Sequence, residues 1–334
     1  MFRVLRLLAF ACFAGVVVFA VWLIFLASAP LPLLSENVEF SILTGSSLRS
    51  ATRQMAEAGV PLSEAHFNLL ARITGKGTRI KAGSYEVARG ASPWELLRKI
   101  TSGDVLLSEA MFVEGWTFTQ IRRALDALEA VRHDTRGLTD AQIMERLGLP
   151  SGMAAEGLFF PETYLFAKGE SDLKVLARAH RLMSRKLEAV WEARGEGLPY
   201  KTTYEALILA SIVEKETGDP AERATIAGVF VNRLRIGMRL QTDPTVIYGM
   251  GELYKGNIRK ADLERDTPFN SYTRAGLPPH PIAMPGLAAL RAAVNPAKTD
   301  AIYFVARGDG SHQFSRTLEE HNRAVTRYQK KGRP

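Results

Sequence analysis

The stretch from Leu7 to Ser35 contains no charged residue, and no other feature of the sequence constrains the fold as strongly. About 20 apolar residues can span a bilayer as a helix, so Leu7 to roughly Ala27 is predicted to cross a membrane once. Arg3 and Arg6 precede the stretch, whereas acidic residues follow it. The positive-inside rule therefore places the N-terminus in the cytoplasm and the rest of the chain on the other side of the membrane.

A cleaved signal peptide is the alternative for this stretch, because Ala27-Ser-Ala29 resembles a small-residue cleavage site. The apolar run is longer than a usual signal core, and Pro30 follows the site directly. Both features favour an uncleaved anchor. Cys12 is the one cysteine and lies inside the apolar run, which excludes an intramolecular disulfide and a thiolate zinc site.

The remainder of the chain predicts an α+β fold, because segments with strand and helix periodicity alternate along it. The predicted segments are 1–34, the N-terminus and membrane helix; 35–113, a small βααβ domain; 114–155, a connector and the start of the next region; and 156–334, a larger α+β domain. In the small domain the elements are expected at 38–43, 47–58, 63–73 and 79–87. Ser92 and Thr117 begin capping-box patterns that predict two further helix starts.

The segment Tyr204–Thr217 is predicted to be a helix that is apolar on nearly every side over Ala206–Val213, and therefore buried. Glu214 follows without a break and shares a helix face with Ser211. A carboxylate there is costly unless it is paired or holds a proton, and a protonated carboxyl group is what a general acid requires. The alternative is a solvated last turn that stops at Gly218.

Several other chemistries are excluded by the absence of their sequence patterns. The six histidines show no metal-ligand spacing, and neither a Gly-x-Ser-x-Gly elbow nor a phosphate-binding glycine loop is present. No metal or cofactor is therefore predicted. The net charge of +8 is spread along the chain without a basic and aromatic cluster, which argues against nucleic acid and suits an anionic polymer or membrane surface.

What remains is carboxylate chemistry among neutral hydrogen-bonding groups, which suits an N-acetylated sugar chain. The candidate substrate-binding residues are Gln241, Asp243, Tyr248, Asn270, Tyr272 and Thr273. Each has a structural alternative: Asp243 can cap a turn, and the polar loop residues can bond within their own loops. The aromatic segment 156–164 is either a packed loop or a wall of a sugar site.

Two routes of cleavage stay open at this point. A hydrolase of the usual kind needs a second carboxylate, which Glu216, Glu222, Asp243 or Asp266 could supply. If the sugar carries a 2-acetamido group and a free 6-hydroxyl, one Glu can act first as acid and then as base, and the product is a 1,6-anhydro sugar. Glu216 points away from Glu214 and is expected either to form an ion pair or to be solvated.

Several motifs together resemble the endolytic murein transglycosylases of the YceG-like family. They are Val213-Glu-Lys-Glu-Thr217, the run from Asn232 to Gly249, Asn270-Ser-Tyr-Thr273 and Gly276-Leu-Pro-Pro279. One position departs from the family pattern, because His280 stands where a glycine is expected. That departure concerns the contacts of the loop and leaves the implied reaction unchanged.

The resemblance implies a LysM-like small domain and a catalytic domain in the periplasm, held by the inner membrane. It implies cleavage between MurNAc and GlcNAc in nascent peptidoglycan strands, with 1,6-anhydroMurNAc ends and Glu214 as the acid and base. It also implies a role in terminating or trimming strands, near penicillin-binding synthases. Two alternatives are retained: a two-carboxylate hydrolase, and a non-enzymatic peptidoglycan-binding scaffold of the wall-synthesis machinery.

Overall fold

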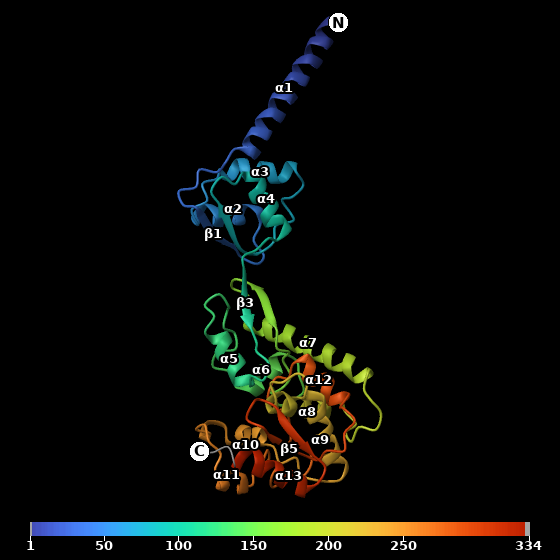
Figure 1. Cartoon of the computed structure of the whole chain (residues 1–334). Coiled ribbons are helices and arrows are strands. Elements are labelled where there is room, and N and C mark those ends of the chain that lie inside the picture. Colours follow the sequence, from blue (N-terminus) through green and yellow to red (C-terminus); the bar gives the residue numbers. More distant parts are fainter. Residues whose placement is uncertain (1, 331–334) are drawn as a thin grey trace. The chain divides into compact units, whose positions relative to one another are not determined.

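The computed structural model describes residues 2–330, so Met1 and the last four residues of the predicted 156–334 domain lie outside it. The chain forms two compact units (Figure 1). Unit 1 comprises Met1–Ser108 and Leu165–Glu170, and unit 2 comprises Glu109–Tyr164 and Ser171–Pro334. The prediction of an α+β fold is confirmed, whereas the four predicted segment boundaries stay a prediction.

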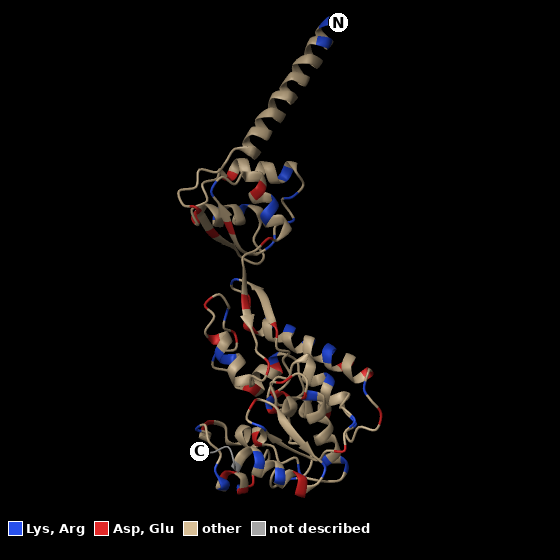
Figure 2. Cartoon of the chain, in the orientation of Figure 1, with Lys and Arg blue, Asp and Glu red and all other residues tan. Residues whose placement is uncertain are grey.

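Helix α1 (Phe2–Ser28) contains the apolar stretch and is long and apolar enough to cross a membrane. None of its residues is buried in the protein. Figure 2 shows that charged residues lie on both units but that α1 carries none beyond its first turns. A membrane anchor and a signal sequence share this length and composition.

Unit 1 is built around an antiparallel pair of strands that is covered by helices. Its elements are β1 (Asn37–Ile42), α2 (Leu48–Glu57), α3 (Glu64–Ile73), β2 (Gly83–Ala88), α4 (Pro93–Ser102) and the start of β3 (Leu107–Met111). The register places Asn37 opposite Ala88 and Ile42 opposite Gly83. Alternate residues of β1 are buried, so one face of the pair packs on the core.

The helix starts that the sequence predicts in unit 1 are confirmed, whereas the predicted start of one strand is wrong. Ser47 and Ser92 cap α2 and α4, as the sequence predicts, and Ser92 forms the complete capping box with Glu95. The strand predicted from residue 79 begins only at Gly83. The strand begins late because the N–H of Lys81 bonds to the carbonyl of Ile100, near the end of α4, instead of to β1.

Unit 2 is mainly helical and contains one complete strand pair. Its helices are α5 (Phe118–Asp126), α6 (Asp140–Arg146), α7 (Asp172–Glu192), α8 (Thr203–Glu216), α9 (Arg223–Arg235), α10 (Asp243–Met250), η1 (Gly251–Leu253), α11 (Lys260–Glu264), α12 (Leu287–Val294), α13 (Leu318–Val325) and η2 (Thr326–Lys330). Strand β4 (Thr163–Ala167) pairs with β3, and β5 (Tyr303–Ala306) pairs with β6 (His312–Ser315).

Helix α8 is the buried centre of unit 2. Every residue from Ala206 to Val213 is buried, as its apolar pattern predicts. Thr202 and Glu205 form a capping box that fixes where the helix begins. Helices α7, α9, α10 and α12 all pack against α8. This packing fixes the direction in which the last turn of α8 presents its polar side chains.

Candidate active site

Glu214 is the first polar side chain after the buried run of α8, and only 6% of it is exposed. Its Oε2 accepts a hydrogen bond of 3.0 Å from the backbone N–H of Gly286. Its Oε1 lies 3.4 Å from Nη2 of Arg223, near the start of α9. Gly286 is the N-cap of α12, where the helix dipole favours negative charge. The carboxyl group is therefore held by two elements packed on α8.

Burial raises the pKa of Glu214 above its ordinary value. The neighbouring carboxylate of Glu114 acts in the same direction, while the N–H of Gly286 and the charges of Arg223 and Lys215 oppose the rise. The expectation of a carboxyl group with a raised pKa at the end of a buried helix is confirmed. A raised pKa makes the carboxyl group a better proton donor near neutral pH, and its partners stabilise the carboxylate that remains after donation.

Glu114, Gly115 and Gly286 belong to this site and were missed by the sequence analysis. The N–H of Gly115 bonds to the carbonyl of Met284 at 2.8 Å, and Nζ of Lys215 lies 3.3 Å from the carbonyl of Gly115. A Cβ at Gly286 would lie 1.8 Å from Oε1 of Glu114, so a larger residue there would displace that carboxylate from its present position. No local pattern links Glu114 and Gly115 to Gly286, because Gly286 lies far from them along the chain.

Glu216 ends α8 on the side away from Gly286. Oγ1 of Thr242 donates a hydrogen bond of 3.1 Å to its Oε2. The residue as a whole is partly exposed, but its carboxyl group is buried, and this burial raises its pKa to about 7. The carboxylate of Asp243 adds to the rise, whereas Thr242 and the charge of Arg233 oppose it.

The sequence offered two interpretations of Glu216, and both are wrong. Within residues 2–330 the carboxyl group forms no ion pair, and it is not solvated. Helical periodicity gives the direction of a side chain but not what it meets there. The structure shows that this direction leads to Thr242, a neutral partner on a neighbouring segment.

The other carboxylates considered for a two-carboxylate reaction are engaged with partners of their own. Glu222 accepts a hydrogen bond of 2.9 Å from the N–H of His312, and its Oε2 lies 2.7 Å from Nδ1 of that residue. Asp266 forms an ion pair with Arg274. Asp243, the first residue of α10, accepts a hydrogen bond of 2.6 Å from the hydroxyl of Tyr272.

The predicted substrate residues Gln241, Asp243 and Tyr272 are brought together. The N–H of Gln241 bonds to the carbonyl of Ser271 at 3.1 Å, and Tyr272 reaches Asp243. Gln241 has a φ of 49°, the one positive φ of a non-glycine residue within residues 2–330. A strained backbone of this kind is often found at functional sites. Substrate contact by these residues stays a prediction.

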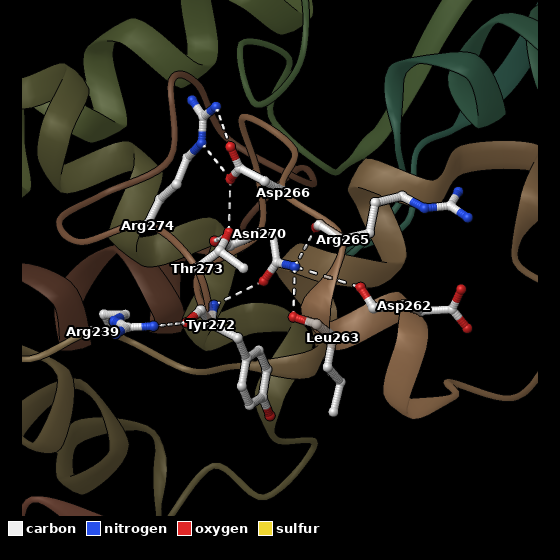
Figure 3. A network of polar contacts seen from close by, with 9 residues as sticks. All are labelled: Arg239, Asp262, Leu263, Arg265, Asp266, Asn270, Tyr272, Thr273 and Arg274. Carbon is white, nitrogen blue, oxygen red and sulfur yellow. Dashed lines mark hydrogen bonds and ion pairs between the residues drawn. The ribbon is translucent and has the colours of Figure 1, made fainter.

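Asn270 and Thr273 bond to α11, to the segment that follows it and within their own turn (Figure 3). Asn270 is 1% exposed, and its Nδ2 donates to the carbonyls of Leu263 and Arg265 at 2.9 and 2.7 Å. Its Oδ1 accepts from the N–H of Tyr272 at 2.8 Å, and Thr273 donates to Asp266 at 2.8 Å. The structure thus uses Asn270 to hold the loop, the alternative that the sequence left open.

Tyr248 lines a cavity of about 620 Å³ together with Glu156 and His280. Its hydroxyl donates a hydrogen bond of 3.1 Å to Oε2 of Glu156, a buried residue whose pKa burial raises to about 7. The ring of His280 packs edge-on against Tyr248 and Phe269. His280 therefore completes an aromatic cluster with these two rings. Glu214 is not among the residues that line this cavity.

The described residues contain no group of three or more His, Cys, Asp or Glu side chains that could hold a metal ion. The carboxyl groups of Glu214 and Glu216, whose pKa values burial raises, are suited to proton transfer and hydrogen bonding. The site around Glu214 draws on α8, α9, the turn that contains Glu114, and the N-terminus of α12.

Comparison with known proteins shows what the chain is similar to. Residues 40–327 match the model of the YceG-like family. An endolytic murein transglycosylase of Bacillus subtilis is 32% identical over 309 residues, which cover 87% of this chain and 85% of that protein. A protein of the same name from Streptococcus pneumoniae is 28% identical over 88% of this chain and 58% of its own length. A crystal structure of a yceG-like protein from Listeria monocytogenes superposes with a TM-score of 0.53 and 28% identity, covering 86% of this chain and 98% of that one.

Proposed function

The chain belongs to the YceG-like family, and from that membership we propose that it is an endolytic murein transglycosylase, which cleaves peptidoglycan strands between MurNAc and GlcNAc. The observation that supports a catalytic role most directly is the carboxyl group of Glu214. It is 6% exposed, has a raised pKa, and is bound by Gly286 and Arg223. A binding scaffold has no need of such a group, because its burial costs stability.

The proposed reaction uses Glu214 twice. The protonated carboxyl group donates its proton to the glycosidic oxygen, so that the bond from C1 of MurNAc breaks and GlcNAc leaves with a hydroxyl group. The carboxylate then takes the proton of the 6-hydroxyl of MurNAc while that oxygen bonds to C1, which yields the 1,6-anhydro end. The N–H of Gly286 and the charge of Arg223 stabilise the carboxylate between the two steps.

The arrangement of the other carboxylates supports a single-carboxylate route. Glu222, Asp243 and Asp266 are each engaged with a partner other than Glu214. Glu114 is the exception, because it is exposed and neighbours Glu214. A hydrolase that used Glu114 as its second carboxylate is therefore the competing proposal, and it would leave reducing ends instead of anhydro ends.

We further propose that α1 anchors the protein in the inner membrane, with both units in the periplasm. The uncharged composition of α1 and the preceding Arg3 and Arg6 support this orientation. The order β1, α2, α3, β2 in unit 1 agrees with a LysM-like domain that binds the glycan. Termination or trimming of nascent strands near penicillin-binding synthases would follow from this location.

The test is to incubate the full-length protein in detergent with uncrosslinked peptidoglycan strands and to measure product masses, with Glu214→Gln in parallel. Fragments that end in 1,6-anhydroMurNAc, absent with Glu214→Gln, are the expected result. Reducing ends, which are heavier by one water molecule, would overturn the transglycosylase proposal in favour of hydrolysis. Binding of strands without any cleavage by the native protein would favour the scaffold.

A further inference from the structure

A buried polar network joins the end of α8 to the segment before α10. It consists of Glu216, Thr242, Thr245 and Ser271, and is called the Thr242 network below. Thr242, Thr245 and Ser271 are at most 4% exposed. Thr242 donates to Glu216 at 3.1 Å, and its backbone N–H donates to the hydroxyl of Ser271 at 3.0 Å. The hydroxyls of Thr245 and Ser271 lie 2.7 Å apart.

The Thr242 network is built from neutral hydrogen bonds. Burial raises the pKa of Glu216 and the charge of Arg233 opposes that rise, but the two residues share no hydrogen bond among those described. The Arg233 guanidinium donates to the carbonyls of Leu240 and Ile302 instead. Asp243 places a second acidic group on the same side. The hydrogen-bond partner of the buried Glu216 carboxyl group is therefore the neutral hydroxyl of Thr242, and the hydrogen bonds of the Arg233 guanidinium go to backbone carbonyls instead.

The network ends at the predicted substrate segment. Thr242 lies between Gln241, whose backbone has the positive φ, and Asp243, which binds the hydroxyl of Tyr272. The N–H of Gln241 bonds to the carbonyl of Ser271, a member of the network. The strained conformation of Gln241 persists only if its neighbours hold it, and the bonds of Thr242 and Ser271 are positioned to do so.

We propose that Glu216 is a positioning residue, which through Thr242 holds residues 241–243 and the 270–273 loop in register with Glu214 on the same turn of α8. The inference rests on the proposed function, because it assigns the segment to substrate binding. It gives Glu214 and Glu216 different tasks: Glu214 faces Gly286 and Arg223 and transfers protons, whereas Glu216 faces Thr242 and fixes the substrate segment.

The charge of Glu216 and its shape can be separated by substitution. Glu216→Gln keeps the length and an acceptor for the hydroxyl of Thr242, whereas Glu216→Ala removes the partner and leaves that buried hydroxyl unsatisfied. Thr242→Ser and Thr242→Val form a second matched pair at the other end of the same hydrogen bond. Thr242→Ser retains the hydroxyl, whereas Thr242→Val removes it. The Thr242 pair decides the question if Glu216→Ala fails to fold.

The first measurement is the affinity for uncrosslinked peptidoglycan strands in full-length protein that carries Glu214→Gln, so that binding is read without cleavage. Adding Glu216→Ala or Thr242→Val should weaken binding about 10-fold, because the released segment must then be ordered when the strand binds. Adding Glu216→Gln or Thr242→Ser should leave it within about 2-fold. With Glu214 restored, Glu216→Ala should raise KM by a similar factor and leave kcat nearly unchanged.

Two results would overturn the inference. If Glu216→Gln is as damaging as Glu216→Ala, an ionised carboxylate is required and Glu216 has a chemical task. If Glu216→Ala and Thr242→Val lower only the melting temperature, with unchanged affinity and KM, the network is structural. A native protein that binds strands but cleaves none would overturn the proposed activity while the affinity comparison still decides the role of Glu216.

Discussion

The two units differ in the polar groups that they bury. The buried polar side chains of unit 1 are the small hydroxyls of Thr52, Ser84 and Ser92, and no acidic residue is buried in the part of unit 1 that the structure describes. Unit 2 encloses the carboxyl groups of Glu156, Asp172, Glu214, Glu216 and Asp262. Burial of a carboxyl group costs stability, so unit 2 carries groups that packing alone does not require.

The buried carboxylates of unit 2 also differ from one another. Asp172 accepts hydrogen bonds from the N–H groups of Asp134 and Thr135, and from the hydroxyl of Thr135 at 2.6 Å, so it joins two segments of the fold. Glu214 has only the N–H of Gly286 and the long contact with Arg223. Glu214, with few donors and a pKa that burial raises, is the carboxyl group of this set that is suited to proton transfer, whereas the bonds of Asp172 hold the fold together.

The largest effect is expected from Glu214→Gln. We expect cleavage to fall by about a thousand-fold, because the amide cannot donate or accept the proton. Rates on uncrosslinked strands, with the melting temperature measured alongside, test this. The matched control is Glu39→Gln in unit 1, which should leave the rate nearly unchanged. Equal losses in the two variants would remove the distinction between the units.

In unit 1 the largest effect should come from apolar packing. Leu97 is fully buried in its core, so Leu97→Ala should lower the free energy of unfolding of unit 1 by about 2–5 kcal/mol. Hydrogen exchange of the amides of unit 1 in the full-length protein measures this. Leu43, which is 67% exposed, provides the control: Leu43→Ala should change exchange only slightly. A similar loss in both would show that unit 1 does not depend on this core.

Gly286→Ala tests whether the site needs room for Glu114. The added methyl group overlaps the Glu114 carboxylate and must displace it or the N-terminus of α12, so kcat/KM should fall by about 10-fold. Gly218→Ala is the control, because a Cβ there meets nothing within 4 Å and its φ is not in the left-handed region. An unchanged kcat/KM in Gly286→Ala would mean that the carboxylate of Glu114 moves freely.

The pH dependence should respond in opposite directions to the two charges beside Glu214. Glu214 must be protonated to act as an acid, so the rate falls as the pH rises through its pKa. Glu114→Gln removes a like charge and lowers that pKa, which moves the alkaline limb of kcat/KM to lower pH. Arg223→Met removes an opposite charge and moves the limb to higher pH. Both variants leave Lys215 and the N–H of Gly286 unchanged. If both variants moved the alkaline limb in the same direction, this explanation of the pKa of Glu214 would be contradicted.

The smallest effect is expected at the surface of unit 1. Lys168 and Glu39 form an ion pair of 2.5 Å, but about half of each side chain is exposed. Lys168→Ala should therefore change the free energy of unfolding by less than about 1 kcal/mol. Chemical denaturation at low and high salt measures it. A loss comparable to that of Leu97→Ala would show that charges at the surface, and not only apolar packing, stabilise unit 1.

The sequence by itself determined the features that depend on neighbours a few residues apart. The apolar composition of α1, the caps at Ser47 and Ser92, and the burial of Ala206–Val213 follow from composition, short-range hydrogen bonds and helical periodicity. The same reasoning identified Glu214 as a carboxyl group with a raised pKa, because a buried helix delivers it directly.

The tertiary structure decided what these side chains meet. Gly286 is 72 residues from Glu214 along the chain, and Gly115 is 100 residues from Lys215, so no local pattern in one sequence records that they meet. The same holds for Glu216, whose direction was predictable but whose partner Thr242 was not. Periodicity fixes which way a side chain points, whereas its charge state and task depend on the groups that packing brings to it from distant segments.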